Sequence, residues 1–115
     1  MKKVSGQIKC EGDHQIPEGA VVTVQVCEIK FEAENPTPIS LGEKKIHNAQ
    51  KFPIDYEVEY DDSFLDAETL QGHYIVRARV DLNGSVGFIT ETPHSVIDWE
   101  KYELLERVDI EVARA

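Results

Sequence analysis

Hydrophobic and polar residues alternate with a period of two along most of the chain. This alternation is typical of β-strands that bury one face, because successive side chains on a strand point to opposite faces. About seven segments fit a strand, judged by alternation or by dense β-branched residues. They are Val4 to Cys10, Ala20 to Val26, Ile39 to His47, Phe52 to Tyr60, Tyr74 to Leu82, Val86 to Thr90 and Arg107 to Val112. The pattern therefore predicts an all-β protein.

Turn and loop residues separate these segments. Asn83-Gly84 lies between two alternating runs, and both residues readily adopt the positive φ of a two-residue hairpin. We expect Gly42 to break the third strand and the two prolines of Asn35 to Pro38 to form a loop or an edge. Asp62 to Leu70 combines capping residues with helical spacing, which predicts a short helical connector near residues 62–70.

Length and composition suit one folded domain, residues 1–115, because 41% of the 115 residues are hydrophobic and 30% are charged. Short antiparallel strands in one domain predict a two-sheet β-sandwich of immunoglobulin-like or transthyretin-like type. The formal charge of −10 at pH 7 argues against nucleic acid and anionic membranes as partners. The acidity serves solubility or marks a basic partner surface.

The only cysteines are Cys10 and Cys27. If the two segments that end at them pair as a hairpin around residues 11–19, the thiols lie too far apart for a disulfide. We therefore expect two buried, reduced thiols. No stretch approaches the roughly twenty apolar residues of a membrane span, and no apolar segment follows Met1-Lys2-Lys3. We expect no signal peptide and a cytoplasmic location as encoded, or a periplasmic or outer-membrane one if a precursor was trimmed.

Five segments of the chain are similar to one known family. The first two are Val4 to Ile8 and Ile16 to Val26, at the start of the predicted sheet. The others are Phe52 to Asp61, Tyr74 to Val80 and Gly84 to Thr90, with its hairpin glycine. Together they resemble the YbaY/YscW family over most of the chain. These motifs are mostly structural, so the resemblance implies a β-sandwich more strongly than a particular activity.

The family includes lipoprotein chaperones called pilotins. Pilotins are exported, lipid-anchored to the bacterial outer membrane, and help ring-forming secretin subunits to reach it and assemble. The resemblance therefore implies a non-enzymatic, chaperone-like role. No apolar signal region precedes Cys10, so the resemblance does not extend to a lipidated cysteine at this position. It assigns no binding residue.

The residues themselves predict no metal, cofactor or catalytic site. The densest acidic cluster is Asp61, Asp62, Asp66 and Glu68. It lacks the glycine of a calcium-binding loop, so we interpret it as helix capping and a solvated face. The histidines are His14, His47, His73 and His94, and none of them forms a pair at metal-ligand spacing. No serine, cysteine or threonine is flanked as a nucleophile would be, and we expect no enzyme.

Arg77 and Arg79 share the polar face of one predicted strand in a chain with few basic residues. Two interpretations remain open. The arginines bind a partner carboxylate, since a guanidinium matches a carboxylate with two parallel hydrogen bonds. Alternatively, they form cross-strand ion pairs with the acids of the Phe52 to Tyr60 strand. Those acids are Asp55, Glu57 and Glu59.

Trp99 and Tyr102 lie in the segment that least resembles the family. Exposed aromatic side chains there would suit a binding hot spot. The alternative is that Trp99 closes one end of the sandwich, because a small domain needs its few large side chains in the core.

We predict a non-enzymatic protein- or peptide-binding module of chaperone or adaptor type, acting as a monomer on an unidentified partner. Contact would use a sheet edge or groove, with the edge expected at Asn35 to Ile46. The candidate partner-binding residues are Arg77, Arg79, Trp99 and Tyr102. The alternative function is a small-molecule or carbohydrate-binding β-sandwich module, and a truncated outer-membrane lipoprotein is a third interpretation.

Overall fold

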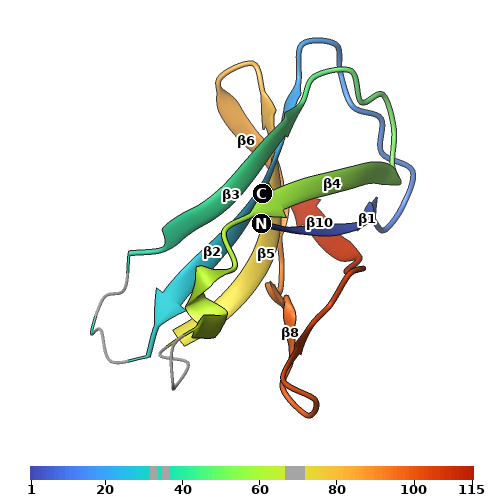
Figure 1. The fold of residues 1–115 in the computed structure, drawn as a ribbon. Helices are drawn as coiled ribbons and strands as arrows, with labels where there is room; N and C mark the ends of the chain where they lie inside the picture. The colour runs from blue at the N-terminus through green and yellow to red at the C-terminus, as the bar shows by residue number, and fades with distance from the viewer. Residues whose placement is uncertain (32–33, 35–36, 67–71) are drawn as a thin grey trace.

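The computed structural model describes residues 1–31, 34, 37–66 and 72–115. Figure 1 shows the elements, all of them strands apart from one short 3-10 helix. In chain order they are β1 Lys2–Cys10, β2 Val21–Lys30, β3 Ile39–Ile46, β4 Ile54–Tyr60, η1 Ser63–Asp66, β5 Gly72–Leu82, β6 Ser85–Thr90, β7 His94–Ser95, β8 Ile97–Asp98, β9 Glu103–Leu104 and β10 Ile110–Arg114. The predicted all-β class is therefore confirmed.

The long strands are hydrogen-bonded into one continuous sheet. Its order is β3-β2-β5-β6-β10-β1-β4, with the short β7 added beside β5. β8 and β9 form a separate two-stranded hairpin. The pairings are antiparallel except for β1 with β10, which is parallel. The prediction of two separate antiparallel sheets therefore does not describe the hydrogen bonding, because no break divides the ladder into two.

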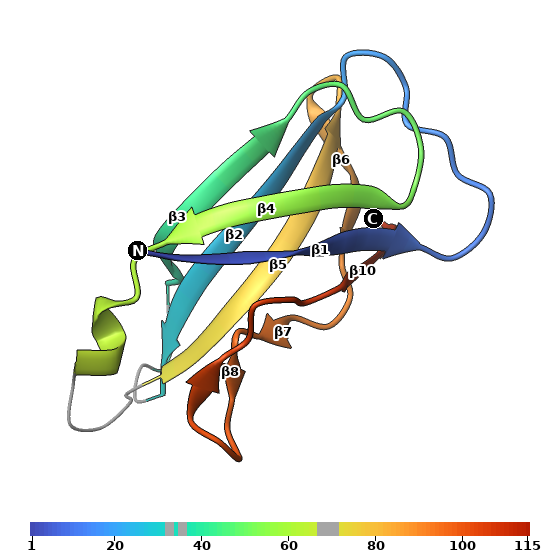
Figure 2. The same cartoon turned by 45° about the vertical axis from the view of Figure 1, so that its right-hand side comes forward.

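The sheet folds over so that its two end strands meet and nearly close a barrel. In Figure 2, β1 and β4 cross over β3, β2 and β5. At the meeting point the Asp61 N–H donates a hydrogen bond to the Leu41 carbonyl at 2.9 Å. A Cβ added to Gly42 would lie 2.1 Å from the Glu59 carbonyl oxygen. β3 continues through Gly42, so the glycine does not end the strand, although the pairing with β2 shifts register beside it. Gly42 also allows β4 to approach β3 closely.

The core lies between these crossing groups of strands. The β4 side chains alternate between buried and exposed along the whole strand, as their sequence predicted. Large side chains that are almost fully buried come from both groups, and they include Val4, Ile8, Val22, Val24, Val26, Val58, Tyr60, Val76, Val80, Phe88 and Ile110. Alternate side chains of β2 and β5 therefore point into the core, and the side chains between them face outward.

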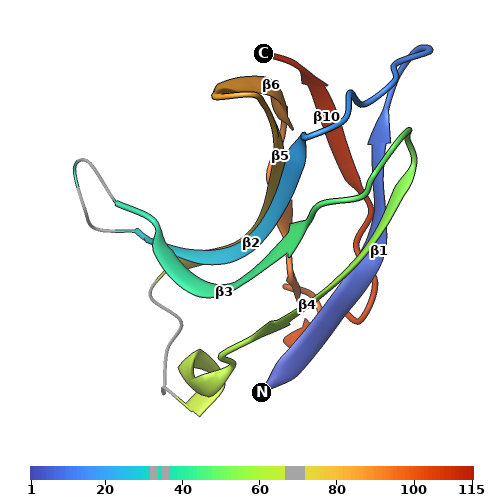
Figure 3. The ribbon, with the colours of Figure 1, turned by 90° about the horizontal axis from the view of Figure 1, so that it is seen from above.

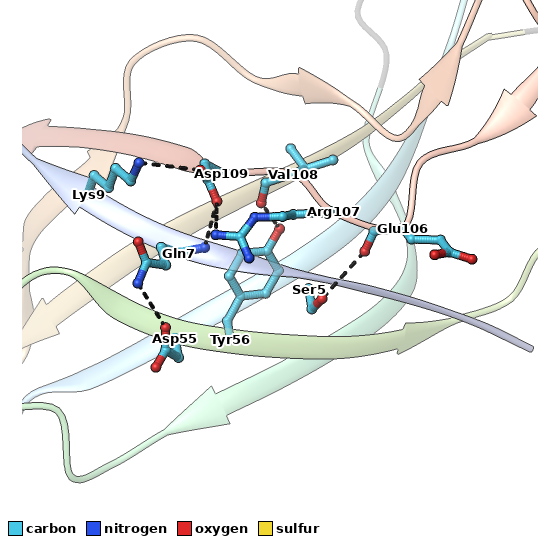
Figure 4. Close-up of polar contacts among 9 residues, drawn as sticks. All are labelled: Ser5, Gln7, Lys9, Asp55, Tyr56, Glu106, Arg107, Val108 and Asp109. Atoms are coloured by element: carbon cyan, nitrogen blue, oxygen red, sulfur yellow. Dashed lines mark hydrogen bonds and ion pairs between the residues drawn. The ribbon is translucent and has the colours of Figure 1, made fainter.

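The segment that leads into β10 packs along β1 (Figure 4). Ser5 accepts a hydrogen bond from the Val108 N–H at 2.8 Å and donates its own N–H to the Glu106 carbonyl at 3.0 Å. The Gln7 N–H donates to the Asp109 carboxylate at 3.0 Å instead of to a backbone carbonyl. That hydrogen bond lowers the pKa of Asp109, and the positive charges of Lys9 and Arg107 lower it further. A side-chain acceptor thus continues the pairing where the backbone ladder is interrupted.

The hairpin considered for the first two strands does not form, because β1 pairs with β4 and β10 rather than with β2. Cys10 and Cys27 are both free. Cys27 is buried as predicted, whereas Cys10 is only half-buried at the end of β1. Which strands pair depends on residues far apart in the chain, and the alternation of each strand alone does not determine it.

The local turn predictions fare better. Asn83 and Gly84 have φ values of 49° and 98° and join β5 to β6, which confirms the hairpin. The helical connector is confirmed over Ser63–Asp66, where the Asp61 carboxylate accepts the Ser63 N–H at 2.9 Å. This hydrogen bond lowers the pKa of Asp61. The remainder of the predicted connector, residues 67–70, lies outside the described residues.

Candidate functional site

The outward face of the β2 and β5 pair forms a shallow groove. Figure 3 shows β2, β3 and β5 bent together into an arc whose open side is turned away from β1 and β4. A groove of about 280 Å³ lies among these strands. Its lining includes Thr23, Gln25, Glu43, Arg77, Arg79 and Ile89. The β2 and β5 positions in this set alternate with core residues, so the same periodicity that builds the core places polar side chains in the groove.

Arg77 is held in place within this groove. Its Nε and Nη2 donate hydrogen bonds to the Gln25 Oε1 at 3.2 and 2.9 Å, across the β2–β5 pair. The guanidinium is only partly exposed. Over the part of the chain that the structure describes, Arg77 forms no ion pair with a carboxylate, and Glu43 on the same groove is not paired with it. A fixed guanidinium without an acid partner is suited to receiving one from another molecule.

The predicted cross-strand ion pairs for these arginines are wrong, because β4 is bonded to β1 and not to β5. The acids of β4 instead contact β1, where Lys3 approaches Glu57 at 3.6 Å and Glu59 at 3.7 Å. Arg79 has a different partner, since its Nε lies 3.2 Å from the carboxylate of Asp81 on the same strand. The two arginines are therefore not equivalent, since Arg79 has an acid partner on its own strand and Arg77 is bonded to a neutral amide.

The buried thiol of Cys27 lies on the outward side of β2, close to Arg77. Burial raises the pKa of Cys27, while the neighbouring guanidinium acts in the opposite direction. Burial is the larger of the two effects. A protonated, enclosed thiol is a poor nucleophile, so we interpret Cys27 as a structural residue.

Trp99 and Tyr102 lie on the β8–β9 hairpin, which extends from one end of the molecule in Figures 1 and 2. Their rings meet edge to face with centroids 5.9 Å apart. The side chains are 39% and 66% exposed. Trp99 therefore does not close an end of the core, which was the alternative interpretation. The Asp98 carboxylate orders the tip by accepting the N–H groups of Glu100 and Lys101.

The sheet edge predicted at Asn35 to Ile46 is only partly available. β3 is an end strand of the sheet, but the hydrogen bond from Asp61 to Leu41 occupies part of its outer side. Its exposed charged side chains are Glu43, Lys44 and Lys45. Such charges oppose the addition of another strand. Asn35 and Pro36 lie outside the described residues.

Two further hollows lie where the β1–β2 and β3–β4 loops meet. One of about 670 Å³ is bordered by residues of both loops, including His14, Lys51 and Phe52. The other, of about 490 Å³, includes Glu18 and His47. The sequence did not point to either hollow, because the loops that form them are about 35 residues apart in the chain.

The described residues contain no group of three or more His, Cys, Asp or Glu side chains placed to hold a metal ion. Within the same residues there is no helix long and apolar enough to cross a membrane.

Comparison with known proteins identifies the family of the chain. The sequence model of the type III secretion system lipoprotein chaperone family, YscW, matches residues 1–106. The chain belongs to the YscW family. This confirms the resemblance seen in the sequence and extends it through the β8–β9 hairpin. No curated protein matches the chain.

A solved structure shares the fold of this YscW family member. It is an alternative pilotin from the type II secretion system of Vibrio cholerae, which is 22% identical with a TM-score of 0.77. The match covers 99% of this chain and 96% of the pilotin chain. At this identity the likeness concerns the fold alone. The nearly closed sheet is therefore an arrangement that the two proteins have in common, whatever each of them binds.

Proposed function

We propose that this YscW family member is a non-enzymatic protein-binding chaperone that receives an acidic segment of its partner in the Arg77 groove. The observation that carries the proposal is the orientation of Arg77 by Gln25, without an acid partner among the described residues. Unlike Arg79 and Arg107, which approach aspartates at 3.2 and 3.3 Å, Arg77 keeps its charge available to a partner. Membership of a chaperone family supports protein binding over catalysis.

The groove suggests what the partner segment carries. A carboxylate bonded to Arg77 would be charge-assisted and partly shielded from water, which strengthens it. Ile89 borders the same groove and is 49% exposed, so an apolar side chain next to the acid would gain from burial there. We therefore expect a segment with an aspartate or glutamate beside an apolar residue. Trp99 and Tyr102 would form a second contact for a longer partner.

We propose that the partner is a secretin subunit of a bacterial secretion system and that the chain binds it as a monomer. The family name refers to the type III system and the similar structure to a type II pilotin. The resemblance to pilotins implies secretin subunits as the clients. It also implies a periplasmic meeting place, which cell fractionation would test against the cytoplasmic location expected from the sequence.

The test is capture of each secretin encoded in the same genome by the tagged chain, with purified components. Arg77→Glu should abolish capture, because the new carboxylate repels the acid of the partner. Lys2→Glu is the matched control, since it makes the same charge change on β1, on the opposite side of the fold. Capture that survives in Arg77→Glu would reject the groove, and failure to capture any secretin would reject this partner.

A further inference from the structure

The larger loop hollow is held open by backbone contacts between two loops. The Ile16 N–H donates to the Gln50 carbonyl at 3.0 Å. Next to it, Gln15 and Lys51 form an isolated antiparallel bridge. Figure 2 shows the β1–β2 and β3–β4 loops together at one end of the fold. The hollow is therefore pre-formed, and a ligand would not have to order both loops on binding.

One side of this hollow is aromatic. Phe88 is almost fully buried and belongs to the core. The Phe52 ring meets it edge to face at 5.2 Å, and the His14 ring does so at 5.5 Å. Phe52 and His14 both line the hollow and are half-buried. They offer an apolar surface of fixed position to a ligand.

The remaining lining includes four residues whose side chains can donate hydrogen bonds. They are Lys9, Gln15, Gln50 and Lys51. Asp13 is the one acid among the described residues that line it. Lys9 is engaged by Asp109 at 3.3 Å, whereas Lys51 has no ion pair within the described part of the chain. In so acidic a protein, this lining favours a negatively charged ligand.

We propose that this hollow binds a small organic anion, with a phosphate or carboxylate group held at Lys51 and an apolar body against Phe52. The volume of about 670 Å³ lies within the usual range of small-molecule sites. This function goes beyond protein binding in the Arg77 groove and does not depend on it. The smaller hollow contains Glu18 and no lysine, so it offers an internal contrast and should not bind the anion.

Phenyl phosphate is a suitable probe, because it carries the charge and the apolar body together. In a titration followed by amide NMR shifts, we expect changes in residues 12–15 and 51–52, which line only the larger hollow, and none at Glu18 or His47, which line only the smaller one. Lys51→Gln should weaken binding about tenfold through loss of one charge-assisted hydrogen bond. Lys101→Gln, on the distant β8–β9 hairpin, makes the same charge change and should bind as the wild type does.

Three further titrations complete the test. Inorganic phosphate and benzyl alcohol should each bind more weakly than phenyl phosphate, since each supplies half of the proposed contacts. Phosphatidylglycerol vesicles that shift the same amides would identify the anion as a lipid headgroup, and a response to phenyl phosphate alone would identify it as a free molecule. The proposal is overturned if phenyl phosphate shifts neither loop, if inorganic phosphate binds as tightly, or if Lys51→Gln binds unchanged.

Discussion

Arg77 and Gln25 are joined by two hydrogen bonds from one guanidinium to one amide oxygen, at 3.2 and 2.9 Å. The pair crosses from β5 to β2 on the concave outer face. A neutral amide fixes the orientation of the guanidinium and leaves its charge uncompensated. The relationship therefore prepares Arg77 for a carboxylate supplied by a partner, at a lower entropic cost than a free arginine would require.

Gly42→Ala should lower the free energy of unfolding by about 2 kcal/mol, the typical cost of overpacking. The added Cβ would lie 2.1 Å from a backbone oxygen of β4, so the two end strands would have to separate. Urea denaturation measures this change. Gly84→Ala is the comparison, because a Cβ there meets nothing within 4 Å and only the φ of 98° is strained. It should cost about 1 kcal/mol, and an equal or larger loss would contradict close strand contact as the reason for Gly42.

Tyr56 and Tyr60 should respond in opposite directions to replacement by phenylalanine. The Tyr56 hydroxyl donates to the Val108 carbonyl and joins β4 to the segment before β10 (Figure 4). The Tyr60 hydroxyl is buried and has no hydrogen-bond partner among the described residues. Burial, with a smaller contribution from Asp62, raises the pKa of Tyr60 to about 12.

Tyr56→Phe should therefore destabilise the fold by about 1 to 2 kcal/mol, because a buried carbonyl loses its donor. Tyr60→Phe should be neutral or stabilising by up to about 1 kcal/mol, since it removes an unsatisfied polar group. Denaturant titrations of both variants suffice. A destabilised Tyr60→Phe variant would show that its hydroxyl has a partner after all.

Asp109 should make stability depend on pH in the acid range. Its pKa is lowered, first by the hydrogen bond from the Gln7 N–H and then by Lys9 and Arg107. The stabilisation is therefore complete above the unfolded pKa of about 3.9 and disappears as pH falls through the lower folded pKa. Asp109→Asn should melt below the wild type near neutral pH, with the difference vanishing in strong acid. A constant difference in melting temperature across this range would exclude the charge as its source.

Trp99 should behave as a surface residue. Its emission should be quenched by acrylamide, because 39% of the residue is exposed. Trp99→Ala should lower the free energy of unfolding by roughly 2 kcal/mol, less than a fully buried tryptophan would cost, because only part of the ring is covered. A blue-shifted emission that acrylamide does not quench would place Trp99 in the core and remove it from the candidate binding residues.

The features predicted correctly are those set by neighbouring residues. The alternation of β4 and the turn at Asn83-Gly84 each depend on one short stretch, so the sequence sufficed for both. The neighbours of β1 depend instead on the pairing of residues about 50 and 100 positions away, and the sequence therefore could not exclude the hairpin considered for the first two strands. The role of Gly42 could not be predicted for the same reason, because it depends on the close approach of β4, which is distant in the chain.

The candidate site follows the same rule. Arg77 and Arg79 were noticed because basic residues are scarce, and their shared face followed from the period of two. One of the two interpretations gave them acid partners on β4, and it depended on an assumed strand order. In the observed strand order Gln25 lies opposite Arg77, and Arg79 pairs with Asp81 on its own strand. The sequence alone could not distinguish the two arginines in this way. The loop hollows were missed for the same reason.

The most direct test of the account is the dissociation constant of the captured secretin subunit for the wild type, Arg77→Glu and Lys2→Glu, measured beside their melting temperatures. The account predicts binding weakened about a hundredfold or more in Arg77→Glu, with Lys2→Glu unchanged and all three proteins melting alike. An unchanged dissociation constant for a folded Arg77→Glu protein would contradict it.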